Sequence, residues 1–395
     1  MTASRGATRD ELQAIEAWVT ERQAQWLMLL EELVRLESPS DDPQAVGRCA
    51  DRAAVAFYDW AGCADRPGPD LTPPCRRLQS GRAGGVLLLG HLDTVWDRGS
   101  FSPLFERAGD RIVGPGVFDM KGGVVVACAA LAALRALGCA EGGATVLLTG
   151  DEEVGSHRSR DLIEAAARAH QAVLVLEPPV GQAVKTARKA VGQFSVTVTG
   201  RAAHAGIEPE RGVNAIVELA AQIPQIASLG DPDVGTTVTV GVVRGGTRAN
   251  VVPARASADV DMRVRTVREA ERVEAGLRAL RPVHPEARLE VSGELNRPPL
   301  PPRATADLFS RAREVAASLG WTSLEGAEVG GGSDGNFTAA LGVPTLDGLG
   351  LVGGNAHAAG EWVVPSELPR RAALLAGVVL GCWRVAPEPV GAGDA

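Results

Sequence analysis

Apolar residues follow two different periods along this chain of 395 residues. Segments with helical spacing alternate with short runs that are apolar throughout and that predict buried strands. Such runs, separated by helices, are typical of a largely parallel sheet that helices cover on both faces. The pattern predicts an α/β domain built from residues 1–190 and 303–395. Its expected helices are 10–36, 45–61, 124–137, 161–170 and 304–319, and its expected strands are 85–90, 144–149, 172–176 and 343–349.

The pattern changes near Val191, where apolar and polar residues begin to alternate as in half-buried antiparallel strands. The order strand, helix, strand, strand, helix, strand is that of a ferredoxin-like split unit. A stiff Pro-rich linker, Arg297–Pro302, closes this region, so we expect residues 191–302 to form an inserted α+β domain. Its expected strands are 193–199, 236–243, 256–264 and 288–292, and its expected helices are 213–226 and 267–280.

Composition excludes several classes of protein. The net charge of −8 and the single Tyr argue against a nucleic-acid partner. The first residues lack the apolar core of a signal peptide, and no run of 18 apolar residues predicts a membrane span. We therefore expect a cytoplasmic protein without a membrane partner. Its six scattered cysteines are expected to be reduced thiols, with a Cys63–Cys75 pair as the open alternative.

Ionisable residues gather where the buried strands of the first domain end. Ligands bind at this edge of an open α/β sheet, and buried carboxylates need a partner. A single strand-end histidine is more often structural, and a lone Glu-Glu pair is usually a solvated turn. Together, however, two imidazoles and at least four carboxylates form the ligand set of zinc in hydrolytic sites. The residues are His91, Asp93, Asp119, Glu152, Glu153, Glu177 and His357.

The motifs around these residues resemble a known family. His91-Leu-Asp93-Thr-Val, Asp119-Met-Lys-Gly-Gly, Asp151-Glu152-Glu153-Val-Gly-Ser and His357 are similar to the dinuclear zinc family of glutamate carboxypeptidase, acetylornithine deacetylase, succinyl-diaminopimelate desuccinylase and aminoacylase. From about residue 25 onward the resemblance also includes Gly200-Arg-Ala-Ala-His204-Ala-Gly, Asn250-Val-Val-Pro and Gly330-Gly-Gly-Ser-Asp334. The glutamate carboxypeptidase branch is the most similar.

The resemblance implies a role for each strand-end residue. Asp119 would bridge two zinc ions, with Co²⁺ or Mn²⁺ as other metals that the same ligands accept. His91 and Glu177 would complete one ion's ligands, and Glu153 and His357 the other's. Asp93 would hold the second ring nitrogen of His91. Glu152 would be the general base that takes a proton from the attacking water and delivers it to the leaving amine.

The resemblance also implies that the inserted domain serves as a lid and as a dimerisation domain. His204 would reach the active site of the other subunit and polarise the scissile carbonyl. Asn250 and Arg263 would clamp the substrate carboxylate, although an exposed salt bridge is the plain alternative for Arg263. Gly332 and Ser333 would bring backbone N–H groups to the substrate, with an ordinary loop as the alternative. One departure from relatives is the Ala358-Ala359 pair after His357, which Glu361 still follows.

These expectations describe a homodimeric two-zinc amidohydrolase that acts on an N-acyl amino acid or small peptide with a free carboxylate. Release of glutamate by a carboxypeptidase is the leading hypothesis. Deacylation of an N-acyl diamino acid, of the acetylornithine or succinyl-diaminopimelate type, is the alternative. A non-catalytic binding homologue is the remote one, and it predicts a missing ligand or base.

Overall fold

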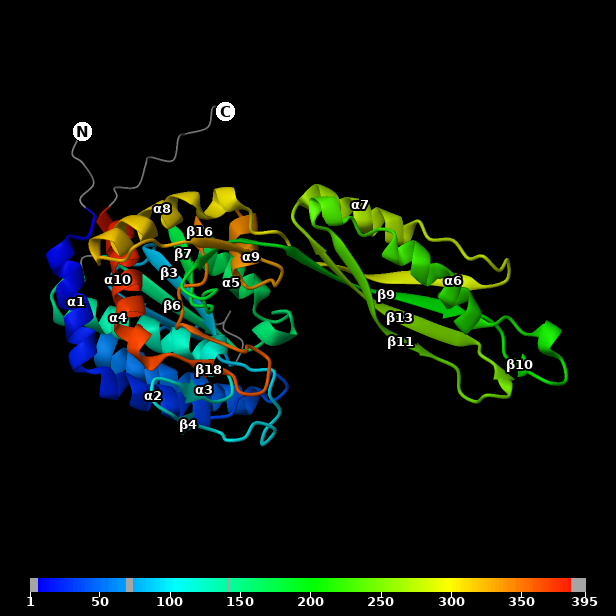
Figure 1. The fold of residues 1–395 in the computed structure, drawn as a ribbon, viewed down its shortest axis with the longest axis horizontal. Coiled ribbons are helices and arrows are strands. Elements are labelled where there is room, and N and C mark those ends of the chain that lie inside the picture. Colours follow the sequence, from blue (N-terminus) through cyan, green and yellow to red (C-terminus); the bar gives the residue numbers. More distant parts are fainter. Residues whose placement is uncertain (1–5, 69–73, 141, 385–395) are drawn as a thin grey trace, which may run out of the picture. The chain divides into compact units, whose positions relative to one another are not determined.

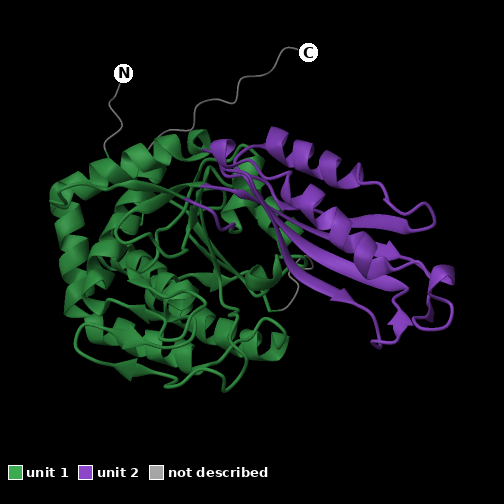
Figure 2. Ribbon diagram, turned by 45° about the vertical axis from the view of Figure 1, so that its right-hand side comes forward, with its two compact units in different colours: residues 1–187, 302–328, 333–395 green, residues 188–301, 329–332 purple. Residues whose placement is uncertain are grey.

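The computed structural model of the protein describes residues 6–68, 74–140 and 142–384. It divides into two compact units, coloured separately in Figure 2. The first unit combines residues 1–187, 302–328 and 333–395, and the second combines 188–301 and 329–332. The boundaries predicted from the sequence lie one to three residues from this division, except that residues 329–332 fall in the second unit.

A six-stranded sheet forms the centre of the first unit within the described ranges. Four neighbouring strands are parallel, and the remaining two strands lie at one edge, each pairing antiparallel with the next strand inward in the sheet. This arrangement confirms the predicted largely parallel sheet. In spatial order the strands are β1 (Ala64–Asp65), β2 (Arg76–Ser80), β6 (Ala144–Thr149), β3 (Val86–His91), β7 (Ala172–Val175) and β16 (Thr345–Leu346).

Helices cover both faces of this sheet (Figure 1). Successive side chains of a strand point to opposite faces, so Leu88 of β3 packs into one core while Leu87 and Leu89 pack into another. The larger core includes α1 (Arg9–Glu21), α2 (Gln23–Arg35), α3 (Pro43–Ala56), α4 (Gly122–Ala136), α8 (Pro302–Ser318) and α10 (Leu368–Arg384). The smaller core includes α5 (Arg160–Arg168) and α9 (Gly335–Ala340).

Helix α4 packs unusually closely on the sheet. A Cβ atom added at Gly123 would lie 1.9 Å from the Leu176 carbonyl oxygen, so only glycine permits this approach. The segment Val117–Ala136 has the length and hydropathy of a membrane-spanning helix, but 94% of its most apolar stretch is buried in the protein. Its composition is therefore that of a core helix.

Two features of the helices differ from the prediction. The predicted helix 10–36 is interrupted at Arg22, which ends α1 and precedes α2. The Trp26 indole, which donates to the Val19 carbonyl at 3.2 Å, fixes the two helices across this break. Helix α10 had no counterpart among the predicted elements, although most of its residues are buried between α1, α4 and α8.

The second unit has its own core beneath a four-stranded antiparallel sheet in the described residues. The strand order β11-β13-β9-β14, with both helices contributing to the core, is the predicted ferredoxin-like arrangement, which is confirmed. Its elements are β9 (Ala190–Thr199), α6 (Ala215–Ala227), β11 (Thr237–Gly245), β13 (Arg255–Val264), α7 (Val267–Arg278) and β14 (Arg288–Arg297).

A small antiparallel sheet completes the first unit. It joins two segments that lie far apart in the sequence, near Asp119 and near His357. Its strands, in spatial order, are β17 (Gly353–Gly354), β18 (Trp362–Val363), β5 (Ile112–Val113) and β4 (Glu106–Arg107).

All six cysteines are free thiols. Five are buried, and Cys139 is partly exposed. The open alternative of a Cys63–Cys75 disulfide is therefore not what the structure contains.

Candidate metal centre

The sheet brings the strand-end residues to one edge. His91 is the last residue of β3 and is paired with Thr149 of β6, while the preceding Leu89 is paired with Val175 of β7. The turn after β6 carries Glu152 and Glu153, and Glu177 follows β7 by two residues. Parallel pairing of three adjacent strands thus places their downstream carboxylates around His91.

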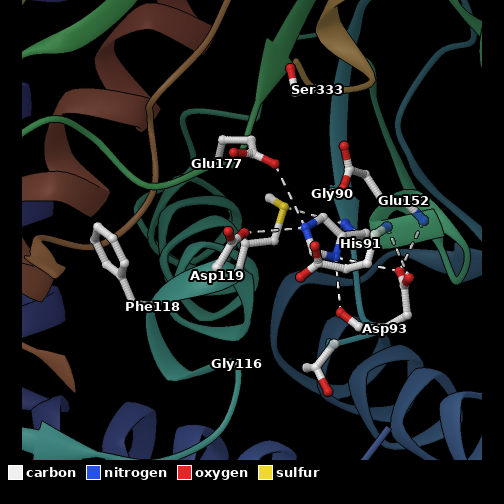
Figure 3. A network of polar contacts seen from close by, with 12 residues as sticks. Gly90, His91, Asp93, Gly116, Phe118, Asp119, Glu152, Glu177 and Ser333 are labelled. Atoms are coloured by element: carbon white, nitrogen blue, oxygen red, sulfur yellow. Dashed lines mark hydrogen bonds and ion pairs between the residues drawn. The ribbon is translucent and has the colours of Figure 1, made fainter. Parts of the chain in front are cut away.

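Asp119 lies between two histidines (Figure 3 shows the His91 side). Its Oδ1 atom is 3.3 Å from His91 Nε2, and its Oδ2 atom is 3.3 Å from His357 Nε2. His91 Nε2 also lies 3.6 Å from Glu177 Oε1, and His357 Nε2 lies 3.0 Å from Glu153 Oε2. The Asp119 Oδ1 atom therefore faces His91 and its neighbour Glu177. The Oδ2 atom faces His357 and its neighbour Glu153.

These separations suit ligands of a common ion. Zinc–nitrogen and zinc–oxygen bonds of 2.0–2.1 Å at a tetrahedral angle put neighbouring ligand atoms about 3.3 Å apart. Among the described residues, His91 Nε2 and Asp119 Oδ1 are buried side-chain atoms without a hydrogen-bond partner. Ligand atoms of His91, Asp119 and Glu153 lie within 4.8 Å of one another, as do those of His91, Glu152 and Glu177. The His, Asp and Glu side chains at this edge thus fit a divalent metal centre.

The raised pKa values of the histidines and of Glu153 also favour a bound cation at this edge of the sheet. Hydrogen bonds to Asp119 and Glu153 raise the pKa of His357 to about 10, against the opposing effect of burial. Burial alone would lower the pKa of His91, but Asp119, Asp93 and Glu177 outweigh it and raise the pKa well above its usual range. Burial also raises the pKa of Glu153 to about 7. These carboxylates need positive charge nearby, which protons or metal ions can supply.

Asp93 is fully buried on the other side of the His91 ring. Its Oδ1 and its backbone carbonyl lie 3.4 and 3.0 Å from His91 Nδ1. The same carboxylate accepts the backbone N–H groups of Glu152 and Glu153 at 3.2 and 3.1 Å, and the Ser40 hydroxyl at 2.7 Å. Asp93 therefore joins the histidine to the glutamate turn, and its predicted effect on the His91 tautomer stays a prediction. The contact from Ser40 was not anticipated, and no motif around it signals the role.

The adjacent glutamates have different surroundings. The Glu153 carboxylate contacts His357, whereas a Glu152 oxygen belongs to the group around His91 and Glu177. The Asp93 carboxylate accepts hydrogen bonds from both backbone N–H groups, and these bonds fix the conformation of this short turn. The geometry gives each carboxylate its own position at the centre, and the base role of Glu152 stays a prediction.

His357 lies in the connection between β17 and β18 and adopts a left-handed backbone conformation, with φ of 58°. This conformation costs a non-glycine residue roughly 1–3 kcal/mol, and residues held in strained conformations cluster at active sites. Surrounding contacts must therefore hold the loop that presents its imidazole.

Lys185 is a further charged residue at this edge. Its Nζ atom lies 3.2 Å from Glu177 Oε2, and its side chain is about nine-tenths buried. The ammonium group orients one oxygen of Glu177 and leaves the other facing His91.

His204 and Asn250 lie together in the second unit. Strand β10 (Ala203–His204) pairs with β12 (Val251–Val252), and the Ala205 N–H donates to the Asn250 carbonyl at 3.0 Å. His204 Nδ1 accepts the Gly206 N–H at 3.1 Å, so the neutral imidazole carries its proton on Nε2. That nitrogen is a hydrogen-bond donor on an exposed side chain. The roles predicted for both residues toward the metal centre stay predictions.

Arg263 lies on β13, and its guanidinium is already paired. Its Nε and Nη2 atoms donate to the two oxygens of Asp261, each at 2.8 Å. The plain alternative, a salt bridge on a strand, is thus present in the structure. Its Nη1 also approaches the Gly330 carbonyl at 3.4 Å, and the predicted carboxylate clamp stays a prediction.

Ser333, for which a substrate contact was predicted, makes hydrogen bonds within the first unit, and the substrate contact stays a prediction. Its side chain is fully buried, its hydroxyl donates to Asp347 Oδ2 at 2.6 Å, and its N–H donates to Asn336 Oδ1 at 2.9 Å. The N–H and the hydroxyl of Ser333 thus both donate to side chains of the same unit. Gly332, in the second unit, is partly exposed, and its carbonyl accepts a hydrogen bond from Arg188 at 2.9 Å. The N–H contact predicted for Gly332 stays a prediction.

Comparison with known proteins places the chain among peptidases. Carboxypeptidase G2 from Pseudomonas sp. (strain RS-16) is 29% identical over 377 residues, which cover 91% of this chain and 90% of that protein. Succinyl-diaminopimelate desuccinylase from Rhodospirillum centenum is 31% identical over 325 residues, covering 76% and 81%. Among solved structures, the Bacillus subtilis YXEP protein, described as a dinuclear metal-binding peptidase, shares the fold with a TM-score of 0.64 at 14% identity, covering 91% of this chain and 98% of that one.

The sequence profile of Peptidase family M20/M25/M40 matches residues 87–381, which include every residue of the candidate metal centre. The family resemblance inferred from the motifs is therefore confirmed. The chain belongs to the M20/M25/M40 peptidase family and is a hydrolase of amide bonds.

Proposed function

We propose that the protein is a homodimeric amidohydrolase with two zinc ions in each subunit. Its substrate is an N-acyl amino acid or small peptide with a free carboxylate, and release of glutamate is the leading reaction. The observation that carries the proposal is the position of Asp119, whose two oxygens face different histidine and carboxylate pairs. Similarity to carboxypeptidase G2 over 91% of the chain supports the choice of reaction.

His91, Asp119 and Glu177 would hold one ion, and Asp119, Glu153 and His357 the other. Bound zinc would supply positive charge that acidifies water and polarises the scissile carbonyl. Glu152 takes a proton from the attacking water and delivers it to the departing amine. Asp93 keeps the His91 ring oriented and holds the Glu152 backbone, so the base and the first ion's ligand share one support.

The two candidate reactions differ in the groups on either side of the amide bond that is cleaved. Glutamate release and deacylation of a diamino acid use the same ligands and base but differ in which side of the amide is large. Relatives named carboxypeptidase and desuccinylase keep both hypotheses open. The remote alternative, a non-catalytic binder, predicts a missing ligand or base, whereas every such residue is present.

A substrate panel separates these reactions. Protein stripped with a chelator and then reconstituted with zinc is expected to release glutamate from acyl-glutamates faster than it deacylates N-acetylornithine or N-succinyl-diaminopimelate. Stripped protein should turn over none of them. Faster deacylation would favour the alternative, and inactivity of the reconstituted protein toward all three would contradict both reactions.

Arg263 supplies the proposed clamp, with Asp261 fixing the plane of its guanidinium. We expect Arg263→Lys to raise KM for a substrate with a free carboxylate by about 10- to 100-fold. A lysine ammonium group keeps the positive charge but cannot make the bidentate contact that a guanidinium makes to a carboxylate. Turnover of the same substrate with that carboxylate amidated should change little. Arg244→Lys is the matched control, since Arg244 also pairs with a strand aspartate, Asp259 at 2.6 Å. Equal effects on both substrates would contradict the clamp.

The edge of the second unit's sheet supports a dimer with a second copy. Strand β11 is an edge strand in the described residues, and Val242 and Val243 are exposed on it. Helix α6, which contacts β11, exposes Ile216 and Val217. Unpaired strand edges flanked by apolar side chains favour pairing with an identical edge. An intracellular location remains part of the prediction made from the sequence.

A further inference from the structure

Glu361 is a buried carboxylate that no predicted role includes. It is 1% exposed, and its two oxygens accept four hydrogen bonds. Oε1 accepts the backbone N–H groups of Phe118 and Asp119 at 2.8 and 2.9 Å. Oε2 accepts the Gly116 N–H and the Trp96 indole N–H, both at 3.0 Å.

The backbone of Glu361 holds the same segment. Its carbonyl accepts the Gly114 N–H at 3.2 Å, directly before β18 pairs with β5. Gly116 takes a left-handed conformation, with φ of 68°, within the turn whose N–H groups meet on the carboxylate. Residues 114–119 therefore donate four backbone hydrogen bonds to this one residue, and the Trp96 indole donates a fifth bond to its carboxylate.

The position of Glu361 in the chain links two metal ligands. Glu361 is the last residue of the loop between β17 and β18 that contains His357, and its carboxylate accepts the backbone N–H of Asp119. The His357 and Asp119 side chains meet at 3.3 Å on the far side of this connection. Movement of either segment would thus be resisted by the same carboxylate.

We infer that Glu361 is a positioning residue for the second metal ion, the one assigned to Asp119, Glu153 and His357. It sets the distance between the bridging carboxylate and the His357 imidazole by holding both of their backbone segments. This inference rests on the proposed two-metal centre. Outer partners of metal ligands typically change metal affinity by about 10- to 100-fold when they are lost.

Glu361→Gln is the sharpest test because it keeps the shape of the side chain. One carboxylate oxygen becomes an NH₂ group, which would face N–H donors and cannot accept from them. Zinc binding to metal-free protein, measured at buffered free zinc concentrations, should show one ion bound normally and a second weakened by about 10- to 100-fold. Trp96→Phe removes one donor and keeps an aromatic ring, so a smaller weakening of the same ion is expected.

Glu218→Gln is the matched control. Glu218 is a buried carboxylate of the second unit that accepts the Val283 and His284 backbone N–H groups at 2.9 and 2.8 Å. It contacts none of the predicted metal ligands in the described contacts, so this variant should bind both zinc ions as the wild type does. An equal loss of zinc in Glu218→Gln would show a general effect of destabilisation and would overturn the inference.

Two unweakened zinc ions in Glu361→Gln would also overturn the inference. If that variant does not fold, Trp96→Phe decides: weakening of the second ion supports positioning, and wild-type affinity contradicts it. Wild-type protein that binds fewer than two zinc ions would instead contradict the proposed function, so the two failures are distinguishable without measuring activity.

Discussion

Glu152→Gln is expected to lower kcat by about 10²- to 10⁴-fold while both zinc ions stay bound. Glutamine preserves the size of the side chain and removes its ability to accept a proton from water. The backbone N–H of residue 152, which donates to Asp93, is unaffected by the change. Turnover and zinc content measured on the same sample test the prediction.

Glu153→Gln is the matched comparison, because it makes the same chemical change one residue later. The Glu153 carboxylate contacts His357 at 3.0 Å, so this variant should lose affinity for one ion. Activity in Glu153→Gln should recover in part at high zinc, whereas in Glu152→Gln it should not. Normal turnover by Glu152→Gln, or loss of zinc from it, would contradict the role of general base.

His204→Ala is expected to lower kcat by about 10²- to 10³-fold without releasing zinc, since one donor to the developing oxyanion is removed. The predicted donor is Nε2–H, the proton-bearing nitrogen left when Nδ1 accepts the Gly206 N–H. His284→Ala is the matched control in the same unit, because His284 Nδ1 likewise accepts an N–H two residues later, from Glu286 at 3.2 Å. That variant should keep its turnover.

Mixed dimers test whether His204 acts across the interface. A His204→Ala subunit paired with a Glu152→Gln subunit has one site with an intact base that receives His204 from its neighbour. After denaturation and refolding of equal amounts, random pairing in a two-fold dimer should restore about a quarter of wild-type activity. No recovery in mixtures that sedimentation shows to be dimeric would contradict the cross-subunit role.

The candidate metal centre could be predicted because the ends of buried strands can be located in the sequence. A buried strand followed at once by ionisable residues reveals both its position and its chemistry, as His91 after β3 and Glu177 after β7 illustrate. The ferredoxin-like order was equally clear, since its strands alternate apolar and polar residues at the required spacing.

Other features depend on contacts that sequence periods do not encode. Glu361 looks like an exposed loop carboxylate until the fold brings it to residues 116–119. Helix α10 was not predicted, and its burial depends on its packing between α1, α4 and α8. Ser333 belongs to a glycine-rich motif for which substrate contacts were predicted. In the structure its hydroxyl donates to Asp347 and its N–H donates to Asn336.

Residues 188–301 leave the first unit and rejoin it at nearly the same place. Arg188 and Leu300 exchange two backbone hydrogen bonds, and the Thr305 hydroxyl donates to the Thr186 carbonyl at 3.0 Å. All predicted metal ligands lie outside this stretch, which has a core of its own. A substitution in this self-contained insertion can therefore alter the predicted substrate contacts His204, Asn250 and Arg263 while every predicted metal ligand stays unchanged.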